Sequence, residues 1–482
     1  MSKKIKQTKI VATIGPASEN VETLEKMVRA GMNVCRLNFS HGTYENHAML
    51  IDHIREVEKR TGEPIAIVQD LQGPKLRLGV LPKEGVVLKE GEEVVFSHTP
   101  ETAAEIPIGF DRLSEYVKSG ERILLDDGKL EVVVIRVERA RIIARVVVGG
   151  VLTSHKGLNI PDTDLKTLDV LTEKDKNDLK FGVEQGIEWV ALSFVMDPQD
   201  ILDVKFHIKE IEQSLGISGE SPIRIIAKIE RYEAVKKIEK IIEVSDGIMI
   251  ARGDLGVEMP AESVPLTQKK IIDLARAHAK PVIVATQMLD SMQHSPRPTR
   301  AEVSDVSNAV IDHTDAVMLS NETATGEFPV ETIHTMAKII ISAEASEYNN
   351  IENEIGTTSK KKTIERTMSG LSKLVAEEVG ATVILSASFS GETGRLIAEN
   401  RPELPIAVAT NSHRVLRQLN LSWGVRPFML EECKTIEELI ERSIVKLKDA
   451  KLVESGDKII VVAGEPVGQA GHVNLLEVRE VI

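Results

Sequence analysis

The sequence is poor in cysteine and in long apolar runs, and both shortages argue against whole classes of protein. Only two cysteines occur among 482 residues, Cys35 and Cys433, and they lie far apart in the chain. This count argues against a disulfide framework or a cysteine-based metal site, and it indicates a reducing compartment. No run of about 18 apolar residues is present, so no segment is expected to span a bilayer.

Positive charge and aromatic side chains are also scarce. The chain has 60 lysine and arginine residues against 74 aspartate and glutamate residues, a formal net charge of −14. This balance argues against a general binder of nucleic acid or of anionic membranes, because attraction to phosphates needs a net basic face. A small phosphorylated substrate in a local basic pocket remains compatible with it. Aromatic residues make up only 3%, so we expect cores of Ile, Val, Leu and Ala, as in buried parallel strands.

What is present is an ordinary globular composition. Hydrophobic residues make up 42% and charged residues 28%, and the length predicts roughly two to four domains, each with a core of its own. The basic start, Met1 to Lys9, leads directly into the strand-like segment Ile10–Ile14, without an apolar signal region or a cleavage site. We therefore expect a cytoplasmic location.

Short apolar runs alternate with amphipathic stretches such as Val21–Ala30 and Tyr44–Arg60. This alternation is typical of parallel strands joined by crossover helices. Eight such runs predict an α/β fold, a (β/α)8 TIM barrel, with an open doubly wound sheet as the alternative. The runs are Lys9–Ile14, Asn33–Phe39, Ile65–Val68, Trp189–Phe194, Ile223–Ile229, Gly247–Ala251, Pro281–Ala285 and Ala316–Leu319.

Two parts of the chain depart from this rhythm. The third and fourth runs are separated by a long stretch of short strands and Gly or Asp turns, such as Asp127-Gly128. This predicts an inserted β-rich domain, which at the catalytic face of a barrel is a natural lid. After Glu347 a polar linker leads into an open α/β domain. The predicted domains are therefore the discontinuous barrel, residues 1–74 and 157–347, the inserted lid domain, residues 75–156, and the C-terminal domain, residues 348–482.

Polar and charged residues follow six of the eight apolar runs, at the strand ends where a barrel carries its chemistry. Glu230 and Asp254 offer the oxygen ligands that Mg²⁺ or Mn²⁺ prefers. Arg36, Arg77 and Lys228 can offset the charge of a phosphoryl group in transfer. Together these residues predict metal-assisted phosphoryl or enolate chemistry on a small anion.

Each of these residues also has an ordinary structural interpretation. Carboxylates and hydroxyls after a strand are often helix caps or solvated loop groups, and Thr286 and Ser320 fit that description. Arg36 and Asp70 could form an ion pair at the rim of the barrel. Lys228 follows the apolar residues Ile225, Ile226 and Ala227, so its ammonium would be desolvated unless it is paired. The joint placement of these residues, rather than any one of them, favours a catalytic site.

The exact residue order of six segments is more informative than the chemical groups that they contain. In the family's own order, and with the rest of the chain, they closely resemble the pyruvate kinase family, including its inserted domain and its final domain. The segments are Lys9–Ser18, Arg36–Gly42, Ala227–Glu230, Ile250–Glu258, Ala285–Leu289 and Met318–Ala324, which read KIVATIGPAS, RLNFSHG, AKIE, IARGDLGVE, ATQML and MLSNETA.

The resemblance implies that the chain moves the phosphoryl group of phosphoenolpyruvate to ADP, giving pyruvate and ATP. It implies that Glu230 and Asp254 hold the divalent metal, Mg²⁺ or Mn²⁺. It implies that Lys228 neutralises the phosphoryl group and the enolate, and that Arg36 binds the phosphate. The substrate carboxylate would be held by backbone N–H groups of Arg252, Gly253 and Asp254 together with Thr286. Thr286 and Ser320 would belong to a proton relay whose donor stays open. The resemblance also implies that Asn38, Arg77 and His41 contact the nucleotide, and it leaves the role of Lys166 open.

One departure from the family concerns K⁺. Asn38, Ser40 and Asp70 resemble its monovalent-cation pocket, but K⁺-dependent members have Glu in place of Lys75 and Thr-Lys in place of Leu71-Gln72. The Lys75 ammonium would then supply the charge that bound K⁺ otherwise provides, so we expect activity without K⁺. The alternative is an ordinary solvated lysine at the hinge of the lid.

The resemblance also implies a homotetramer and a phosphorylated allosteric effector in the final domain. The effector residues would be Ser388, Ser390, Gly391, Thr393 and Gly394, and an ordinary strand-to-helix turn is the alternative. The late loop 464–471 contains Glu465 and lacks the Trp and Arg of members regulated by fructose 1,6-bisphosphate. We therefore favour a monophosphate, such as AMP or a sugar monophosphate. The sequence ends soon after Val481, so we expect no extra C-terminal domain of the kind that some bacterial members carry.

Two other functions stay open from the sequence. One is a metal-dependent lyase or aldolase that acts through a pyruvate enolate, which would have no use for a lid or for a lysine placed at a phosphoryl group. The other is a non-catalytic sensor of phosphorylated metabolites with the same fold, which would be expected if the metal ligands or Lys228 were missing. They are all present.

Overall fold

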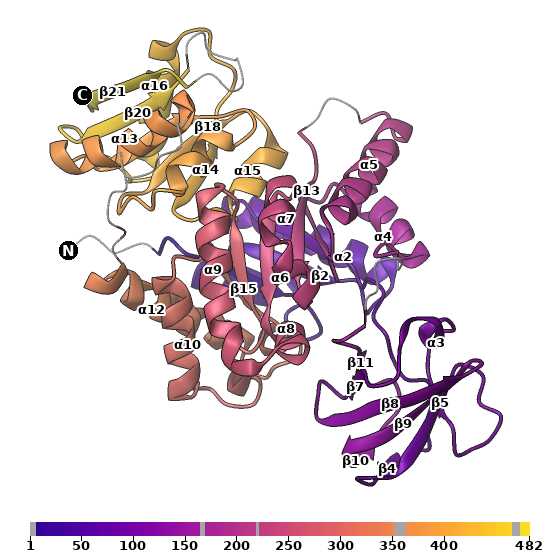
Figure 1. Ribbon diagram of the computed structural model, residues 1–482. Helices are drawn as coiled ribbons and strands as arrows, with labels where there is room; N and C mark the ends of the chain where they lie inside the picture. The colour runs from indigo at the N-terminus through magenta and orange to yellow at the C-terminus, as the bar shows by residue number, and fades with distance from the viewer. Residues whose placement is uncertain (1–5, 164–168, 218–220, 350, 352–362, 465–472) are drawn as a thin grey trace.

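A closed barrel of eight parallel strands forms the centre of the molecule (Figure 1). The computed structural model describes residues 6–163, 169–217, 221–349, 351, 363–464 and 473–482. Around the barrel the strands follow the order β1-β16-β15-β14-β13-β12-β3-β2, so the predicted TIM barrel is confirmed and the open doubly wound sheet is wrong. The strands are β1 (Lys9–Thr13), β2 (Val34–Asn38), β3 (Ala66–Asp70), β12 (Trp189–Leu192), β13 (Arg224–Ile229), β14 (Gly247–Ala251), β15 (Val282–Ala285) and β16 (Ala316–Leu319).

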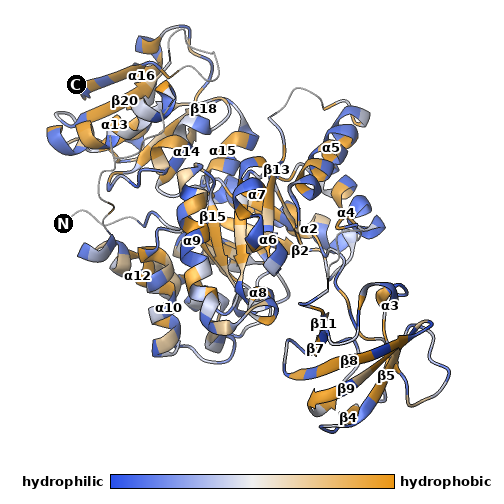
Figure 2. Ribbon diagram, viewed as in Figure 1, coloured by the Kyte–Doolittle hydropathy of each residue, from blue (hydrophilic) through white to orange (hydrophobic). Residues whose placement is uncertain are grey.

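Aliphatic side chains fill both faces of these strands. Every residue of β1, β3, β12, β14, β15 and β16 is buried, and Figure 2 shows the barrel strands mainly in the hydrophobic colour. Inside the barrel, small and branched residues such as Val11, Val34 and Ala66 pack with one large ring, Trp189. The low aromatic content is therefore enough for this core, because helices cover the strands from outside and β-branched residues pack well between the two layers.

The helices around the barrel begin at clear sequence signals. Thr172, Asp197 and Thr299 each cap a helix with the reciprocal pair of side-chain bonds of a capping box. One predicted helix, Ala234–Glu243, is in fact two, because Lys237 is non-helical (φ −110°, ψ 15°) and its ammonium bonds Asp197. The helices and short 3₁₀ turns are α1 (Val21–Ala30), α2 (Tyr44–Thr61), α4 (Glu173–Glu184), α5 (Pro198–Ser214), α6 (Tyr232–Lys236), α7 (Ile238–Val244), α8 (Arg252–Glu258), η1 (Ala261–Ser263), α9 (Val264–Ala277), η2 (Asp290–Gln293), α10 (Arg300–Ile311), α11 (Asn321–Ala324), α12 (Pro329–Glu344) and η3 (Glu347–Asn349).

The insertion leaves the barrel after β3 and stands apart from it on the side of the carboxyl strand ends (Figure 1). A six-stranded sheet of order β11-β7-β8-β9-β5-β6 and a two-stranded sheet of β10 and β4 make up its strands. Near the barrel, a bridge between Arg77 and Gly157 joins the two connecting segments. The elements are β4 (Val86–Leu88), β5 (Glu93–Ser97), β6 (Ile106–Pro107), α3 (Leu113–Tyr116), β7 (Arg122–Leu125), β8 (Leu130–Glu138), β9 (Arg141–Val148), β10 (Gly150–Leu152) and β11 (Leu158–Asn159).

The C-terminal part is an α/β domain around a five-stranded sheet of order β19-β18-β17-β20-β21. Only the edge strand β21 is antiparallel to its neighbour. The predicted helix Arg395–Asn400 begins three residues earlier, at Glu392, because Gly391 takes the left-handed conformation (φ 76°) that starts it. The elements are α13 (Ile364–Val379), β17 (Val383–Ala387), α14 (Glu392–Ala398), β18 (Ile406–Thr410), α15 (His413–Leu419), β19 (Val425–Met429), α16 (Ile436–Asp449), β20 (Lys458–Ala463) and β21 (Leu475–Glu480).

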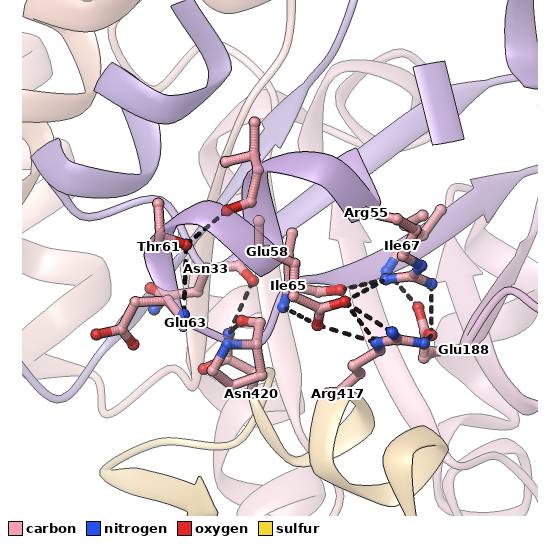
Figure 3. Close-up of polar contacts among 12 residues, drawn as sticks. Asn33, Arg55, Glu58, Thr61, Glu63, Ile65, Ile67, Glu188, Arg417 and Asn420 are labelled. Atoms are coloured by element: carbon pink, nitrogen blue, oxygen red, sulfur yellow. Dashed lines mark hydrogen bonds and ion pairs between the residues drawn. The ribbon is translucent and has the colours of Figure 1, made fainter. Parts of the chain in front are cut away.

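Helix α15 docks the C-terminal domain on the amino ends of the barrel strands. Leu421, just after α15, is fully buried in the same cluster as the barrel's interior side chains. Beside it, Arg417 points between the carboxylates of Glu58 and Glu188 (Figure 3), with Nη2 2.7 Å from Glu58 Oε2 and Nη1 3.3 Å from Glu188 Oε1. The end of the barrel opposite the lid is therefore closed by the other domain.

None of the helices in the described residues has the length and apolar character needed to cross a membrane.

Candidate active site

A cluster of ion pairs lies at the carboxyl ends of the barrel strands. Lys228 Nζ lies 3.0 Å from Asp70 Oδ1 and 2.9 Å from Glu230 Oε1, and it donates to Ser193 Oγ at 2.6 Å. Arg36 Nε donates to the other oxygen of Asp70 at 2.6 Å. The four charged side chains are only 2–12% exposed. β2, β3 and β13 thus bring together residues that lie up to 194 positions apart, from Arg36 to Glu230.

Burial opposes charge in this cluster, and the neighbours decide the outcome. Burial would lower the pKa of Lys228, but Asp70 and Glu230 hold it above its ordinary value. Burial would raise the pKa of Asp70, but Arg36 and Lys228 hold it below its ordinary value. The cations and the Asp70 carboxylate therefore stay ionised, at a place where water screens their charge poorly.

Arg36 forms the ion pair with Asp70 that the sequence left open, and it has further donors. Its Nη1 donates to Thr13 Oγ1 at 2.9 Å, so the guanidinium is fixed from two strands. Nη2 has no hydrogen-bond partner within the described part of the chain. The structural and the functional interpretations of Arg36 are thus compatible, because one edge of the guanidinium remains available to an anion.

Glu230 and Asp254 stand at neighbouring strand ends, after β13 and β14 respectively. Burial raises the pKa of Glu230, and the negative charge of Asp254 raises it further, against the effect of Lys228. Asp254 Oδ1 lies 3.3 Å from Lys75 Nζ. No set of three or more His, Cys, Asp or Glu side chains gathers into a metal cage anywhere in the described residues. Two carboxylates that repel each other, one buried and one partly exposed, fit a Mg²⁺ or Mn²⁺ ion that takes its other ligands from water and substrate.

Thr286 sits in a strained turn at the end of β15. Its φ is +72° and that of Gln287 is +54°, a conformation that costs free energy in residues other than glycine. Thr286 Oγ1 accepts from Gly253 N at 2.8 Å and donates to the carbonyl of Ala285 at 2.6 Å. The backbone of the Arg252–Asp254 segment and the Thr286 hydroxyl are therefore side by side, as a shared carboxylate site requires.

The Arg252 side chain lies elsewhere and has a different role. Its Nη1 and Nη2 each lie 2.7 Å from an oxygen of Asp305 on α10, and Nη2 also donates to the carbonyl of Thr286 at 2.8 Å. The guanidinium therefore holds the strained turn in place. Only backbone atoms of Arg252 remain for the predicted contact with substrate.

Ser320 follows β16 and caps the start of α11. Its N–H donates to Glu322 Oε2 at 2.7 Å, and the other oxygen of Glu322 accepts from Leu289 N at 3.2 Å. The buried Glu322 thus ties the end of β16 to the segment after β15, which brings the Ser320 and Thr286 loops together. Burial raises the pKa of Glu322.

The residues predicted to contact nucleotide and monovalent cation lie between the barrel and the lid. Asn38 Oδ1 accepts from Ser40 N at 3.1 Å, and the carbonyl of His41 accepts from His47 Nε2 at 3.0 Å. Arg77 lines a cavity of about 550 Å³ with Lys75 and residues at the start of α4. Leu71 is buried and its carbonyl accepts from Ser193 Oγ. Lys75 bonds Asp254, and it makes no hydrogen bond or ion pair with Asn38, Ser40 or Asp70 in the described part of the molecule.

The predicted effector loop lines a second cavity, of about 560 Å³, far from this site. Ser388, Ser390 and Thr393 contribute to its wall. Gly391 caps α14, and Gly394 lies within the helix, where an added Cβ would come within 2.8 Å of Val408 Cγ2. Lys166 and Glu465 lie outside the described residues, as does most of the predicted linker.

Sequence reasoning missed four residues that hold this site together. Thr13 is the last residue of β1 and Ser193 follows β12, the two barrel strands whose ends supplied no predicted site residue. Both lie inside the predicted runs Lys9–Ile14 and Trp189–Phe194, so a rule that considers only residues after each run passes over them. Asp305 and Glu322 lie on helices, and nothing in the sequence marks their partners.

The arrangement concentrates cations and carboxylates, fixed before any ligand arrives, at one end of a closed barrel. Phosphoryl transfer depends almost entirely on such positioning and charge compensation. With the comparisons that follow, this places the chain among the phosphotransferases built on a (β/α)8 barrel.

Family models of the pyruvate kinase barrel domain and of the pyruvate kinase alpha/beta domain match residues 5–333 and 367–479. Pyruvate kinase 2 of Synechocystis sp. is 44% identical over 482 residues, 99% of this chain and 79% of that protein. A pyruvate kinase of Clostridium acetobutylicum is 40% identical over 99% of this chain and 100% of its own length. A crystal structure of a pyruvate kinase from Cryptosporidium parvum superposes with a TM-score of 0.91 at 34% identity, covering 99% and 96% of the two chains. The chain belongs to the pyruvate kinase family.

Proposed function

We propose that the chain transfers the phosphoryl group of phosphoenolpyruvate to ADP, giving pyruvate and ATP, as the last step of glycolysis. The observation that carries this proposal is the position of Lys228. Its buried ammonium is fixed by Asp70, Glu230 and Ser193 at the strand ends, where it faces the open end of the barrel. A cation that is already desolvated and oriented stabilises charge in the transition state without reorganisation.

Arg36 and Lys228 divide the work on the phosphoryl group. The free edge of Arg36 binds the phosphate of phosphoenolpyruvate, and Lys228 offsets the charge of the group in transfer and of the enolate that remains. Asp70 supports both, because each of its oxygens accepts from one of the two cations. Glu230 and Asp254 would hold the Mg²⁺ or Mn²⁺ ion, which supplies Lewis-acid stabilisation of the anionic oxygens when bound.

The substrate carboxylate and the proton step belong to the segments after β14 and β15. Backbone N–H groups of Arg252, Gly253 and Asp254 would bind the carboxylate, with the Thr286 hydroxyl beside them. We assign Thr286 and Ser320 to the relay that brings a proton to the enolate. Glu322 supports that assignment, because it ties the two loops together.

The nucleotide would lie between barrel and lid. Arg77 lines a cavity there that has the volume of a small-molecule site, and Asn38 and His41 are assigned to the nucleotide from the family resemblance alone. Residues 75–156 would act as the lid, closing over the nucleotide and excluding water. We propose activity without K⁺ because Lys75 carries a covalently attached ammonium at the hinge of the lid, although that ammonium pairs here with Asp254 and not with the Asn38, Ser40 and Asp70 pocket.

The C-terminal domain, residues 348–482, would be regulatory. We propose that a phosphorylated monophosphate effector binds at the loop of Ser388, Ser390, Gly391, Thr393 and Gly394, which lines the second cavity. A homotetramer in the cytoplasm is the assembly and location we propose on the basis of family membership.

A coupled assay of pyruvate release from phosphoenolpyruvate and ADP tests the reaction directly. We expect ATP and pyruvate in equal amounts, only when Mg²⁺ or Mn²⁺ is added. Lys228→Met should lower kcat by about 100-fold to 1,000-fold, the loss typical of one transition-state donor. Pyruvate release without ADP would favour a lyase, and binding of phosphoenolpyruvate without turnover would favour a sensor.

A further inference from the structure

Helix α4 is the first helix of the barrel after the inserted domain, and it carries two carboxylates that the proposed reaction does not use. Asp175 is fully buried, and Asp178 is only 1% exposed. Carboxylates are rarely buried to this extent unless they are paired or hydrogen-bonded. Their contacts therefore show what this part of the helix holds in place.

The contacts of Asp178 fix the side chain of Lys174. Asp178 Oδ2 accepts from Lys174 Nζ at 2.6 Å, and Asp178 Oδ1 accepts from Tyr44 Oη at 2.8 Å. The ring of Tyr44, at the start of α2, also stacks on Phe181 of α4, with 4.9 Å between the ring centroids. The carboxylate thus has a cation on one oxygen and a hydroxyl on the other, and the Lys174 ammonium is held at a defined place.

Lys174 in turn holds the main chain that follows β2. Its Nζ donates to the carbonyl of Phe39 at 2.6 Å. The N–H of Phe39 donates to the carbonyl of Asp70, at the end of β3, at 3.0 Å. Hydrogen bonds from a charged donor are stronger than those between neutral groups. The main chain of Phe39 is therefore fixed between the Lys174 ammonium and the main chain of Asp70.

A second connection leads from α4 to Asp70 through Gln69. The Gln69 side chain is fully buried, and its Nε2 donates to the carbonyl of Asp178 at 2.6 Å. Successive side chains of a strand point to opposite faces, so Gln69 faces the helix while Asp70 faces the site. Gly182 of α4 leaves room for this contact, because a Cβ at that position would overlap with Gln69 Oε1. The helix thus holds the residue before Asp70 as well as the residue bonded to it.

Asp175 ties the same part of α4 to the start of the insertion. Its Oδ1 accepts from the N–H of Gly73 at 3.2 Å, and its Oδ2 accepts from the N–H of Thr172 at 3.1 Å. Lys174, Asp175 and Asp178 lie within five consecutive residues. These residues therefore anchor the segment after β2, the end of β3 and the hinge of the lid together.

We propose that Lys174 is a positioning residue for Asp70, acting through the main chain of Phe39. This inference rests on the proposed function, in which the Asp70 carboxylate supports both Arg36 and Lys228. The two oxygens of Asp70 accept from these cations at 2.6 and 3.0 Å, so a small shift of its main chain changes both contacts. A displacement of about 1 Å can lower the rate of an enzyme about 100-fold.

Steady-state kinetics of the full chain tests the proposal. Lys174→Met removes the ammonium from a half-exposed side chain and should lower kcat at least fivefold, whereas Lys174→Arg keeps a charged donor and should retain most of the activity. Tyr44→Phe is the matched control: it also removes a partner of Asp178 but leaves the contact with Phe39, so kcat should stay within twofold. In the background of Asp70→Asn, Lys174→Met should cost less than twofold, because its effect passes through Asp70.

Amide hydrogen exchange, followed by mass spectrometry, measures the positioning without turnover. Peptides that cover residues 38–42 should exchange faster in Lys174→Met than in the unmodified chain or in Tyr44→Phe, because the main chain of Phe39 is held less firmly. Circular dichroism checks the fold of each variant. Lys174→Gln is measured beside Lys174→Met as a milder removal of the charge, which serves the same comparison if Lys174→Met does not fold.

Equal values of kcat for Lys174→Met and Tyr44→Phe would overturn the proposal. So would unchanged exchange of residues 38–42, or the same loss of kcat from Lys174→Met with and without the Asp70 carboxylate. Absence of turnover in the unmodified chain, together with faster exchange of residues 38–42 in Lys174→Met, would instead overturn the proposed function and leave the role of Lys174 in fixing this segment intact.

Discussion

Lys75 occupies a position where a small change of charge reaches the metal ligands. It follows β3 at the hinge of the lid, and its ammonium lies 3.3 Å from Asp254 Oδ1. A covalently attached cation differs from a bound ion, because no concentration of salt is needed to fill its place. The residue also connects the lid hinge with the site, so its charge acts on both.

Replacement of Lys75 by Glu should create a requirement for K⁺. The unmodified chain is expected to be active with Mg²⁺ in K⁺-free buffer, and Lys75→Glu to be at least tenfold slower there and to recover on addition of K⁺. The measurement is the coupled assay with K⁺ varied against a tetramethylammonium salt at constant ionic strength. Lys75→Gln is the control, since it removes the charge without offering a carboxylate to K⁺. Strong stimulation of the unmodified chain by K⁺ would contradict the interpretation.

His313 is a second residue whose charge is set by its surroundings. It follows α10 in the left-handed conformation (φ 69°), and its Nε2 is buried without a hydrogen-bond partner in the described residues. Burial lowers its pKa to about 4, and Arg401 and Arg276 add to the effect. The folded protein therefore holds this imidazole neutral where an unfolded chain, with a pKa of about 6.5, would protonate it.

Stability should consequently fall with acidification, and part of the fall should disappear in His313→Asn. Because the pKa is lower in the folded state, the unfolded state binds the extra proton, and stability is lost as pH falls from about 6.5 toward 4. We expect urea unfolding to show about 1–2 kcal/mol less loss between pH 7 and pH 5 in His313→Asn than in the unmodified chain. Asparagine tolerates the left-handed backbone, which makes it the suitable replacement. Equal losses in both proteins would contradict the role of His313.

At the scale of elements, the turn after β15 and helix α10 form one unit. Arg252 leaves α8 to pair with Asp305 on α10 and to hold the carbonyl of Thr286. A strained turn persists only when its surroundings fix it, and these contacts provide the fixation. Asp305 is therefore a positioning residue for Thr286.

Asp305→Asn should reduce activity without removing any group that touches substrate. The weakened hold on Arg252 should let Thr286 shift, and we expect kcat to fall about tenfold with a smaller change in KM for ADP. Steady-state kinetics in both substrates provides the measurement. Thr286→Val and the double variant complete the cycle: the losses should be strongly non-additive if Asp305 acts through Thr286. Additive losses would show that the two residues act independently.

Most of the strands and helices could be predicted from the sequence, because buried parallel strands consist of short runs of β-branched apolar residues. Seven of the eight barrel strands lie within the predicted runs, and β3 extends two residues beyond its run, to Asp70. Strand β19, with Arg426 and Pro427 inside it, does not have that pattern, and it pairs only with β18 at the edge of its sheet. The rule that barrel sites lie at the carboxyl ends of the strands correctly predicted that Lys228 and Arg36 lie at the same end of the barrel. The pairing of the Arg252 side chain with Asp305 could not be predicted, because a partner 53 residues away leaves no local signal in the sequence.

For the whole molecule, the most consequential polar contacts join the two main domains. Glu188 is fully buried and accepts from Arg55, Arg417 and the backbone N–H of Ile67 (Figure 3). Arg417 comes from the C-terminal domain and also makes a bond with each oxygen of Glu58. A buried charge whose partner is removed is costly, in contrast to an exposed pair.

Arg417→Gln should therefore destabilise the full chain by about 3 kcal/mol, because it leaves two carboxylates of the barrel undercompensated. Arg29→Gln removes an exposed pair with Glu25 and should cost less than about 0.5 kcal/mol. Urea unfolding followed by circular dichroism gives both values. A cost for Arg417→Gln no larger than that for Arg29→Gln would mean that solvent screens the interdomain contact.

The position of Leu421 also constrains how the protein is made. Its side chain completes the interior of the barrel, and Lys9 of the first strand donates to the carbonyl of Val425, a few residues further on. On the ribosome, strand β1 emerges more than 400 residues before its partner in that contact. Domains often fold in the order of synthesis. Here the barrel emerges first, but the residues of the C-terminal domain that cover the amino ends of its strands are translated last. During translation the apolar interior at this end of the barrel is therefore exposed until Leu421 is available to cover it.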